Sequence, residues 1–432
     1  MRQAQSEGRQ WRLVLLGDVV DFLQVMDRET LGDTRLAPDT SPATTLMRLE
    51  RIAVGHRDFF AALGRFVAAG FALDIVPGNH DIEFMRPAVQ ERFKRLVADA
   101  CGVPAVSDGI NFYPWIYYVP GVVYAEHGHQ YDANNSFATL VQPFRPGTPD
   151  LTELPLGSYF VVYLFNRIER IDPFADNIKP ATRYLFWALR THPVRALTTL
   201  SVHASFFVRV LGRTGKASLA EQQQRRDAYR AQALPSIAEA TSLPLATLIE
   251  IDKGAAIPAM TSKIRQLQAL IWQPLLAAIP LLASLWALYR VLQRLQSAAR
   301  AMVTLSFGLA ILAWREQQAL KPATDPGGYL LQAALRVDAL LRQTQQNVPL
   351  YVFGHTHTAE QHPLQNDADT PRYVNTGTWT PIVPQAYDLL GTRERFTFVQ
   401  ITHHPATGEV LGRLMVWEDA AGRTSPLPQF MG

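Results

Sequence analysis

Four short clusters of polar residues in this chain have the composition of a metal site. They are Gly17-Asp18-Val19-Val20-Asp21, Gly78-Asn79-His80-Asp81, His127-Gly128-His129 and Gly354-His355-Thr356-His357. Carboxylate and amide oxygens combined with imidazole nitrogens form a mixed ligand set that suits Mn²⁺, Fe or Zn²⁺. A His-x-His pair in an extended segment points both rings to one side, so the pair can serve two neighbouring ions. Each cluster alone is weak, but the four together indicate metal-dependent chemistry.

Each cluster directly follows a segment with the pattern of a buried β-strand. The four apolar runs are residues 12–16, 71–76, 121–126 and 349–353. Further strands are expected near residues 372–374, 395–402 and 409–417. Helices are predicted at 49–69, where Ile52, Phe59, Leu63 and Phe66 share one face, and at 85–100. Because open α/β sheets bind ligands at the carboxyl ends of their strands, we expect the four clusters to converge.

The sequence pattern changes between the third and the fourth cluster. Residues 133–348 are rich in Leu, Ala, Gln and Arg, are punctuated by prolines and lack the alternation of strand, motif and helix. That alternation returns at residue 349. The chain is therefore predicted to hold one α/β catalytic domain in two parts, 1–132 and 349–432, interrupted by an all-helical insertion at 133–348.

The composition excludes several classes of protein. Of the 432 residues, 48% are hydrophobic and 10% aromatic, which excludes a disordered or low-complexity chain. The single cysteine, Cys101, excludes an intrachain disulfide and a thiolate metal cluster, and it fits a reducing compartment. Residues 1–10 are polar and lack the apolar core of a signal peptide. We therefore expect a cytoplasmic protein.

The order of the clusters resembles that of the calcineurin-like metallophosphoesterases. That family carries D-x-H, G-D-x-x-D, G-N-H-[DE], H-G-x and G-H-x-H, in this order, on a four-layer αββα sandwich; the resemblance covers about half of the chain. It implies a hydrolase that cleaves a phosphate ester or a pyrophosphate with a hydroxide activated by two divalent ions. Mn²⁺ is the expected metal, with Fe or Zn²⁺ as alternatives.

The resemblance also implies roles for single residues. Asp18 would bridge the two ions, Asn79, His127 and His355 would complete the shell of one ion, and His357 would belong to the other. His80 would face the scissile phosphate, oriented by Asp81, and would protonate the leaving oxygen.

Three more residues are expected near this site. Asp21 either takes part in the chemistry or fixes the Asp18 loop by hydrogen bonds. His129 either contacts the substrate phosphate or supports a ligand from behind. The segment Tyr373-Val-Asn-Thr-Gly377 resembles the family's strand after the last motif, and Asn375 within it is expected to support the site.

The family's first motif, D-x-H, is absent from this chain. Only sixteen residues precede Gly17, and none of them is Asp or His. The first metal site therefore retains Asp18 and His357 and lacks two ligands, and the sandwich lacks its first strand. We favour the interpretation that Met1 is internal to a longer natural protein, because a sheet without its central strand leaves backbone groups unpaired. The alternative is a variant with a one-metal or inactive site.

The insertion contains an apolar segment whose length approaches that of a membrane span. Gln266 to Tyr289 are 24 consecutive uncharged residues. Both parts of the catalytic domain must lie on one side of a bilayer, however, and the next apolar run, 301–314, has only 14 uncharged residues. A helical hairpin that lies on or dips into the membrane, or an apolar lid over the active site, fits better. The alternative is a buried helical subdomain or a dimer interface.

The small net charge of +3 hides an uneven distribution. The insertion holds 23 Lys and Arg against 13 Asp and Glu, whereas the remainder holds 18 against 25. Basic residues beside apolar helices, such as Arg225, Arg226 and Arg230, favour anionic lipid head groups or a lipid-linked phosphate substrate. We therefore expect peripheral or monotopic attachment at the inner face of the cell membrane. No aromatic stacking platform accompanies the basic residues, so no nucleic-acid partner is expected.

One branch of the family is similar in plan. The UDP-diacylglucosamine pyrophosphohydrolases also place a helical insertion over the site, but the insertion of this chain is far longer, and His80 stands where that branch usually has Arg. Two functions remain open from the sequence. The first is a membrane-associated metallophosphoesterase. The second is a catalytically impaired scaffold that keeps a metal-stabilised fold while its insertion binds membrane or partner proteins.

Overall fold

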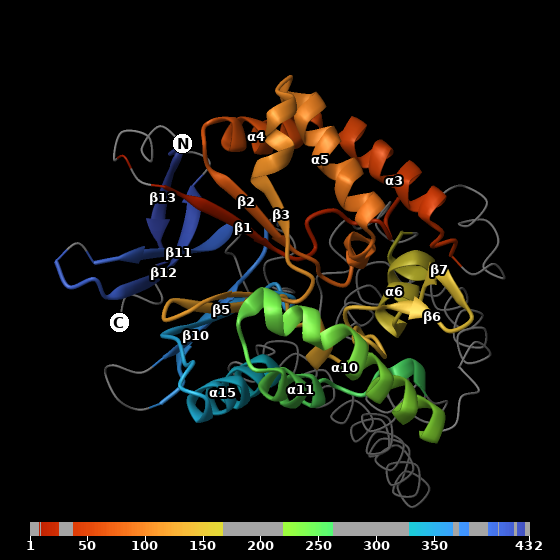
Figure 1. Ribbon diagram of the computed structural model, residues 1–432. Helices are drawn as coiled ribbons and strands as arrows, with labels where there is room; N and C mark the ends of the chain where they lie inside the picture. The colour runs from red at the N-terminus through yellow and green to blue at the C-terminus, as the bar shows by residue number, and fades with distance from the viewer. Residues whose placement is uncertain are drawn as a thin grey trace, which may run out of the picture.

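A mixed α/β fold with several sheets is formed by the part of the chain that the computed structural model describes (Figure 1). This part comprises residues 8, 10–25, 38–166, 219–261, 328–365, 371–379, 396–404, 406–418 and 421–427. The predicted α/β class is confirmed.

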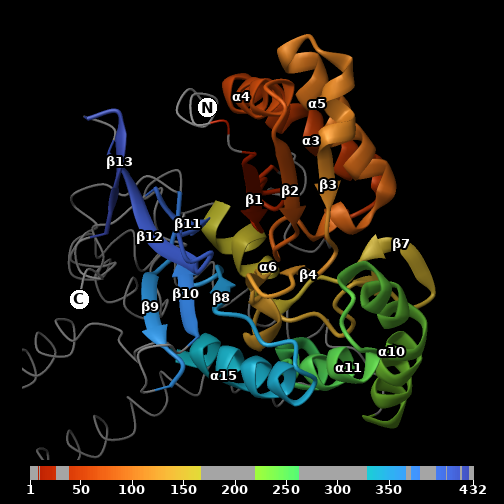
Figure 2. The same cartoon turned by 60° about the vertical axis from the view of Figure 1, so that its left-hand side comes forward.

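The first sheet carries the first two polar clusters at its strand ends. It is parallel, in the order β1-β2-β3, with strands β1 (Arg12–Leu16), β2 (Ala72–Val76) and β3 (Ile110–Phe112). Helices α3 (Pro42–Gly55), α4 (Arg57–Ala68) and α5 (Pro87–Cys101) cover one face of this sheet, as Figures 1 and 2 show. Side chains from β1 and β2, among them Leu13 and Ile75, pack with the helices in one core. The predicted strand at 12–16 is confirmed.

The single helix predicted at 49–69 is wrong, because the chain forms two helices there. His56 leaves the helical conformation, with φ −126° and ψ 39°, directly after Gly55, a poor helix former. Because of the break, the residues of the second helix that face the core are not those expected from one continuous helix. Phe60 is therefore buried, whereas Phe59, which was predicted to face the core, is 40% exposed.

The second sheet joins strands that come before residues 133–348 with strands that come after them. Its order is β4-β5-β8-β10-β9. The strands are β4 (Ile116–Val119), β5 (Val123–Glu126), β8 (Leu350–Phe353), β9 (Ala359–Pro363) and β10 (Arg372–Thr376). Strand β8 is parallel to both of its neighbours, β5 and β10. It thereby brings the ends of β5 and β8 side by side, together with the polar clusters that follow them.

The two sheets face each other across a shared apolar core. Along β5 and β8 the side chains alternate, so that Ala125 and Val352 point to this core and Tyr124 and Phe353 point away from it. Val76 of β2 belongs to the same core. A third sheet of strands β11 (Thr397–His403), β12 (Val410–Glu418) and β13 (Arg423–Pro426) adds further side chains.

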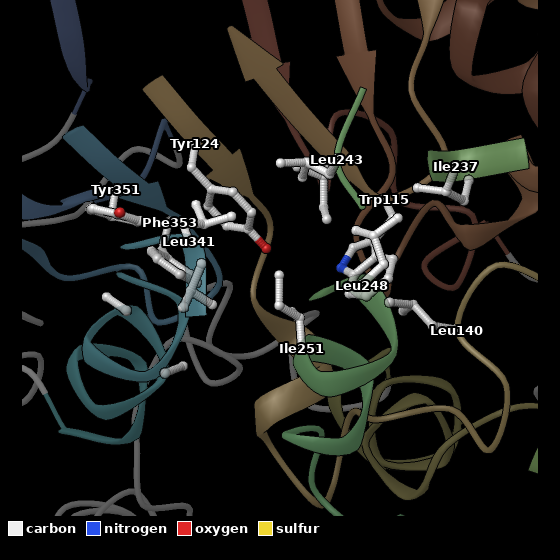
Figure 3. Packing of buried hydrophobic residues seen from close by; sticks show 14 of the residues in the cluster. Trp115, Tyr124, Leu140, Ile237, Leu243, Leu248, Ile251, Leu341, Tyr351 and Phe353 are labelled. Carbon is white, nitrogen blue, oxygen red and sulfur yellow. The ribbon is translucent and has the colours of Figure 1, made fainter. Parts of the chain in front are cut away.

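Helices from the predicted insertion cover the other face of the second sheet. They are α10 (Leu219–Thr241), α11 (Leu245–Lys253) and α15 (Gly328–Gln343). In Figure 3, Leu248 of α11 and Leu341 of α15 lie in one cluster with Trp115, Tyr351 and Phe353. The described helices of residues 133–348 therefore share their core with the sheet and complete a layer order of helices, sheet, sheet and helices (Figure 2).

The prediction that residues 133–348 are all-helical is wrong near the start of this segment. Strands β6 (Phe144–Arg145) and β7 (Thr148–Thr152) form an antiparallel hairpin. Pro146 and Gly147 lie between them, and the φ of +75° at Gly147 suits a tight turn. The short helix α6 (Leu156–Phe160) and a π-helical turn (Val161–Phe165) follow.

Two observations bear on the predicted contact with a membrane. Among the described helices, none combines the length and the apolar composition that a bilayer crossing requires. The apolar segment Gln266 to Tyr289 and the run at 301–314 lie outside the described residues. Of the basic residues, Arg225 pairs with Glu153 at 2.7 Å and Arg230 with Asp252 at 2.7 Å, so acidic neighbours already neutralise part of this charge.

The shared core predicts how the helices contribute to stability. Leu248→Ala and Leu341→Ala each leave a cavity against the second sheet, and each is expected to lower the free energy of unfolding by about 2–5 kcal/mol. Leu245→Ala, on α11 but 37% exposed, is the matched control and is expected to cost less than about 1 kcal/mol. Urea unfolding followed by circular dichroism measures the three values. A core variant that is as stable as the control would contradict the shared core.

Candidate metal centre

Two glycines allow three strand ends to approach each other. Gly17, which follows β1, lies so close to His127 that a Cβ atom would sit 2.1 Å from the ring Nδ1. Gly78, which follows β2, lies against the next loop, and its Cβ would sit 2.2 Å from Asp18 Oδ1. Any larger residue at either position would push the loops apart, which explains the glycine in both clusters.

Asp18 lies at the centre of these loops. Its backbone is left-handed, with φ +55°. Its Oδ1 accepts a hydrogen bond of 2.9 Å from the backbone N–H of His80, and its Oδ2 lies 3.2 Å from His127 Nε2. Burial favours the neutral carboxyl, but the charges of His127 and His80 and these hydrogen bonds hold the pKa of Asp18 well below its usual value. Asp18 is therefore a carboxylate at neutral pH.

His127 presents one ring nitrogen to Asp18. Its Nδ1 lies 2.8 Å from the backbone carbonyl of Leu16, which can only accept, so Nδ1 carries the hydrogen. Nε2 is buried and lies 3.2 Å from Asp18 Oδ2. Burial opposes a charge on the ring, but the Asp18 carboxylate outweighs this and raises the pKa of His127. The ring is thus oriented with its basic nitrogen toward the site.

His355 reaches the same point from β8. Its backbone is left-handed, with φ +66°, and its side chain is buried. The ring centroid lies 5.3 Å from that of His127. The N–H of Gly354 donates to the carbonyl of His127 at 3.1 Å, which fixes the two strand ends to each other.

Asp18, His127 and His355 form a group that could hold a metal ion, because their ligand atoms lie within 4.8 Å of one another. Asn79 supports this interpretation. Its Oδ1 is buried and has no hydrogen-bond partner in the described part of the chain, and an unpaired buried oxygen is unfavourable unless something binds it. A carboxylate, two imidazoles and an amide oxygen fit a divalent transition metal.

Hydrogen bonds from the neighbouring strand β10 hold the last cluster, residues 354–357, in place. Asn375 of β10 is fully buried, and its Nδ2 donates to the carbonyl of Gly354 at 2.8 Å and to Thr356 Oγ1 at 2.9 Å. His357 follows with a left-handed backbone, φ +63°, and is half-buried. It is not a member of the group of three described above.

The structure corrects the prediction that Asp81 orients His80. His80 Nδ1 lies 2.6 Å from Asp21 Oδ2, so Asp21 orients the ring. The other oxygen of Asp21 accepts hydrogen bonds from the backbone N–H groups of Leu23 and Gln24 at 2.8 and 3.1 Å. Asp21 therefore fixes its own loop, which is one of the two alternatives that the sequence left open, and it also orients the ring of His80.

Asp81 instead joins two loops through the backbone. Its Oδ1 accepts from the N–H of Gly78 at 2.5 Å and its Oδ2 from the N–H of Val19 at 2.7 Å. Burial and the neighbouring Asp18 carboxylate raise the pKa of Asp81 to about 6. Asp81 does not orient His80, as was predicted, because backbone N–H groups donate to both of its carboxylate oxygens.

His129 lies beside the group without belonging to it. Its ring is 5.4 Å from that of His127 and meets Phe137 edge-on at 5.6 Å. Both ring nitrogens are buried and lack partners within the described ranges. Burial and the nearby rings of His127 and His355 lower the pKa of His129 well below its usual value, so the ring is neutral.

Sequence reasoning missed three polar residues near the site. Asp132 lies 3.2 Å from His355 Nε2, and Asn135 contacts both Asp132 and Asn79. The spacing Asp-x-x-Asn is typical of a side-chain-capped turn, and this pattern is the sequence signal that could have identified Asp132 and Asn135. Glu83 is buried four residues after Asn79, close to the charges of Arg48 and Asp21. Nothing in its sequence context distinguishes it from an ordinary surface glutamate.

Glu83 predicts a pH-dependent stability. Burial, its main cause, raises the pKa of Glu83 to about 7 from 4.5, and neither carboxyl oxygen has a hydrogen-bond partner among the described residues. A raised pKa means that stability is fully present below pH 4.5 and is lost as the pH rises through 7. Glu83→Gln is therefore expected to match the wild type near pH 4.5 and to exceed it by on the order of 3 kcal/mol at pH 8.

Urea unfolding of both proteins between pH 4.5 and 8.5 measures this difference. Other titrating groups are common to both proteins and cancel. The matched control is Glu91→Gln, which is exposed and should show no pH-dependent difference. A constant difference between wild type and Glu83→Gln across this range would contradict the prediction.

The metal group predicts a thermal response to Mn²⁺. At a concentration about 100 times its dissociation constant, a bound ion stabilises the folded state by about 2.7 kcal/mol, so Mn²⁺ should raise the melting temperature. Asp18→Asn removes the central carboxylate and should abolish the rise, whereas Asp227→Asn, on an exposed carboxylate of α10, should keep it. Calorimetry with and without Mn²⁺ measures the shift. An equal rise in all three proteins would place the ion elsewhere.

Comparison of the chain with protein-family models, with curated proteins and with solved structures found no match.

Proposed function

We propose that this protein is a metal-dependent phosphoesterase that hydrolyses a phosphate ester or a pyrophosphate. The observation that carries the proposal is the convergence of Asp18, His127 and His355 on one point next to the His80–Asp21 pair. A cation site beside an oriented imidazole is the combination that phosphoryl transfer to water requires. The order of the motifs, the two facing sheets and the helices on their outer faces support the same assignment through the resemblance to the calcineurin-like metallophosphoesterases.

The chain offers ligands for a divalent cation. Asp18, Asn79, His127 and His355 would hold one ion, and Asp18 with His357 would contribute to a second. Bound there, the cations would act as Lewis acids on a phosphoryl oxygen and lower the pKa of a water molecule. Mn²⁺ is the proposed metal, and Fe and Zn²⁺ suit the same ligands.

His80 would act on the leaving group. Its Nδ1 is engaged by Asp21, and the carboxylate can only accept, so Nδ1 carries a hydrogen. The second ring nitrogen, Nε2, is then the atom that can give a proton to the leaving oxygen. The carboxylate of Asp21 stabilises the protonated ring and keeps its plane fixed. The side chain of His80 is 19% exposed, so a substrate can reach it.

His129 would contact the substrate as a neutral ring. A neutral imidazole always has one N–H, and neither nitrogen of His129 is engaged by the described part of the protein. Its N–H can therefore donate to a phosphate oxygen that lies between His127 and His129. This role would account for a buried polar ring that has no hydrogen-bond partner among the described residues.

A scaffold function is the second candidate. The group whose ligand atoms lie together has three members among the described residues, and this number suits one ion rather than the pair that two-metal phosphoryl transfer uses. A scaffold would gain stability from Mn²⁺ without turning over a substrate. The two candidates therefore differ in activity and agree in metal binding.

Hydrolysis of bis-p-nitrophenyl phosphate in the presence of Mn²⁺ tests the proposal. His80→Ala is expected to lower kcat by about 100-fold to 10,000-fold, because the proton donor is lost. Asp21→Asn is expected to lower kcat by about 10-fold to 100-fold, because the ring loses its orienting carboxylate. Neither residue belongs to the metal group, so both variants should still show the Mn²⁺-dependent rise in melting temperature.

The matched control is His403→Ala, an exposed histidine at the end of β11, which should retain full activity. Full activity in His80→Ala would contradict the assigned chemistry. No hydrolysis by the wild type, combined with a Mn²⁺-dependent rise in melting temperature, would favour the scaffold. Release of p-nitrophenol measured at 405 nm, in metal-free buffer to which Mn²⁺ is added back, separates these outcomes.

A further inference from the structure

Asp132 lies in a turn that fixes its carboxylate on three sides. The turn follows β5 and the short 3₁₀ helix His129–Tyr131. Asp132 Oδ1 accepts from the backbone N–H of Asn134 at 2.9 Å, and Oδ2 accepts from Asn135 Nδ2 at 2.7 Å. The same Oδ2 lies 3.2 Å from His355 Nε2. The carboxylate is thus held by its own turn and directed at a histidine more than 200 residues later in the chain.

Asn135 extends this contact to a second ligand of the proposed metal site. Its backbone N–H donates to the carbonyl of Asp132 at 2.9 Å, which closes the turn. Its Oδ1 faces Asn79 Nδ2 at 3.4 Å. Gly157 of α6 lies against the same oxygen, where a Cβ would come within 2.0 Å of it. A chain of hydrogen bonds therefore runs from His355 through Asp132 and Asn135 to Asn79.

The direction of each hydrogen bond decides which atom of each side chain carries a lone pair that a cation can bind. A carboxylate only accepts, so the hydrogen of His355 is on Nε2 and the lone pair is on Nδ1. Likewise the Oδ1 of Asn135 only accepts, so Asn79 turns its NH₂ group toward Asn135 and its Oδ1 away. That Oδ1 is the buried oxygen without a partner among the described residues.

We infer that Asp132 and Asn135 are positioning residues, which set the tautomer of His355 and the orientation of the Asn79 amide for one shared metal ion. This inference rests on the proposed function, because it assigns these two residues to the same metal site. Histidine ligands commonly donate their second N–H to a carboxylate, which fixes the ring and makes it a better donor to the metal. Loss of such a partner weakens metal binding by about 10-fold to 100-fold.

Binding of Mn²⁺ to the full chain tests the inference without any assay of activity. In Asp132→Asn, the amide meets the three donors that surrounded the carboxylate, and its NH₂ group must oppose at least one of them. We expect the dissociation constant for Mn²⁺, from the electron paramagnetic resonance signal of the free ion, to rise about 10-fold to 100-fold. Asn135→Ala removes the link to Asn79 and should raise it about threefold to tenfold.

The matched control is Asp108→Asn, which makes the same chemical change at an exposed carboxylate that does not belong to the metal group, and it should bind Mn²⁺ as the wild type does. Melting of the metal-free proteins shows whether each variant folds, and Asn135→Ala decides the matter if Asp132→Asn does not. Folded variants with unchanged affinity would overturn the inference alone and leave Asp132 a structural role. A wild type that binds no Mn²⁺ would overturn the metal site, and the inference with it.

Discussion

The carboxylate of Asp18 is held beside two imidazoles at the meeting point of three strand ends, and the surrounding loops are arranged to make this possible. A carboxylate that is largely removed from water is unfavourable unless charges and hydrogen bonds replace the lost hydration. Here His127 and the backbone of His80 supply both. The close approach depends in turn on Gly17 and Gly78. A Cβ atom at position 17 would collide with the His127 ring, and one at position 78 would collide with Asp18.

Backbone strain is concentrated at the same place. Asp18, His355 and His357 all adopt left-handed conformations, which are unfavourable by about 1–2 kcal/mol for residues other than glycine. Asp81 and Glu83 add buried carboxyl groups whose pKa values are raised. Such an arrangement lowers stability and persists only where the rest of the fold supports it. The two large apolar cores on the outer faces of the sheets supply that support.

The sequence predicted the strands that carry the polar clusters and the convergence of their ends, because buried apolar runs and the motifs after them are local patterns. It did not predict the partner of His80. Asp81 is adjacent in sequence and was the obvious candidate, but its oxygens bind backbone donors, whereas Asp21 approaches from 59 residues away. The contact of Asp132 with His355 was hidden for the same reason, because it depends on the pairing of β5 with β8.

The layer of helices beneath the second sheet was also beyond a local pattern. Helices α10, α11 and α15 read as part of a separate helical segment, because they lie between the third and the fourth cluster. Their apolar faces fit aromatic side chains of β8 and β10, and this complementarity exists only in the folded chain. The break at His56 is a smaller case, where one glycine and one histidine outweighed a continuous apolar periodicity.

The late position of β8 in the chain has a consequence for biosynthesis. β8 is the middle strand of its sheet, so β5 has no parallel neighbour until residues 350–353 have left the ribosome. About 340 residues separate Asp18 from His355, which corresponds to roughly 20–70 s of translation at common rates. Before β8 is synthesised, the loops that contain Gly17 and Gly78 and the aromatic face of β5 already exist, but β8 does not yet pack beside them. A metal ion held jointly by Asp18, His127 and His355 would therefore bind only after residue 355 has been synthesised.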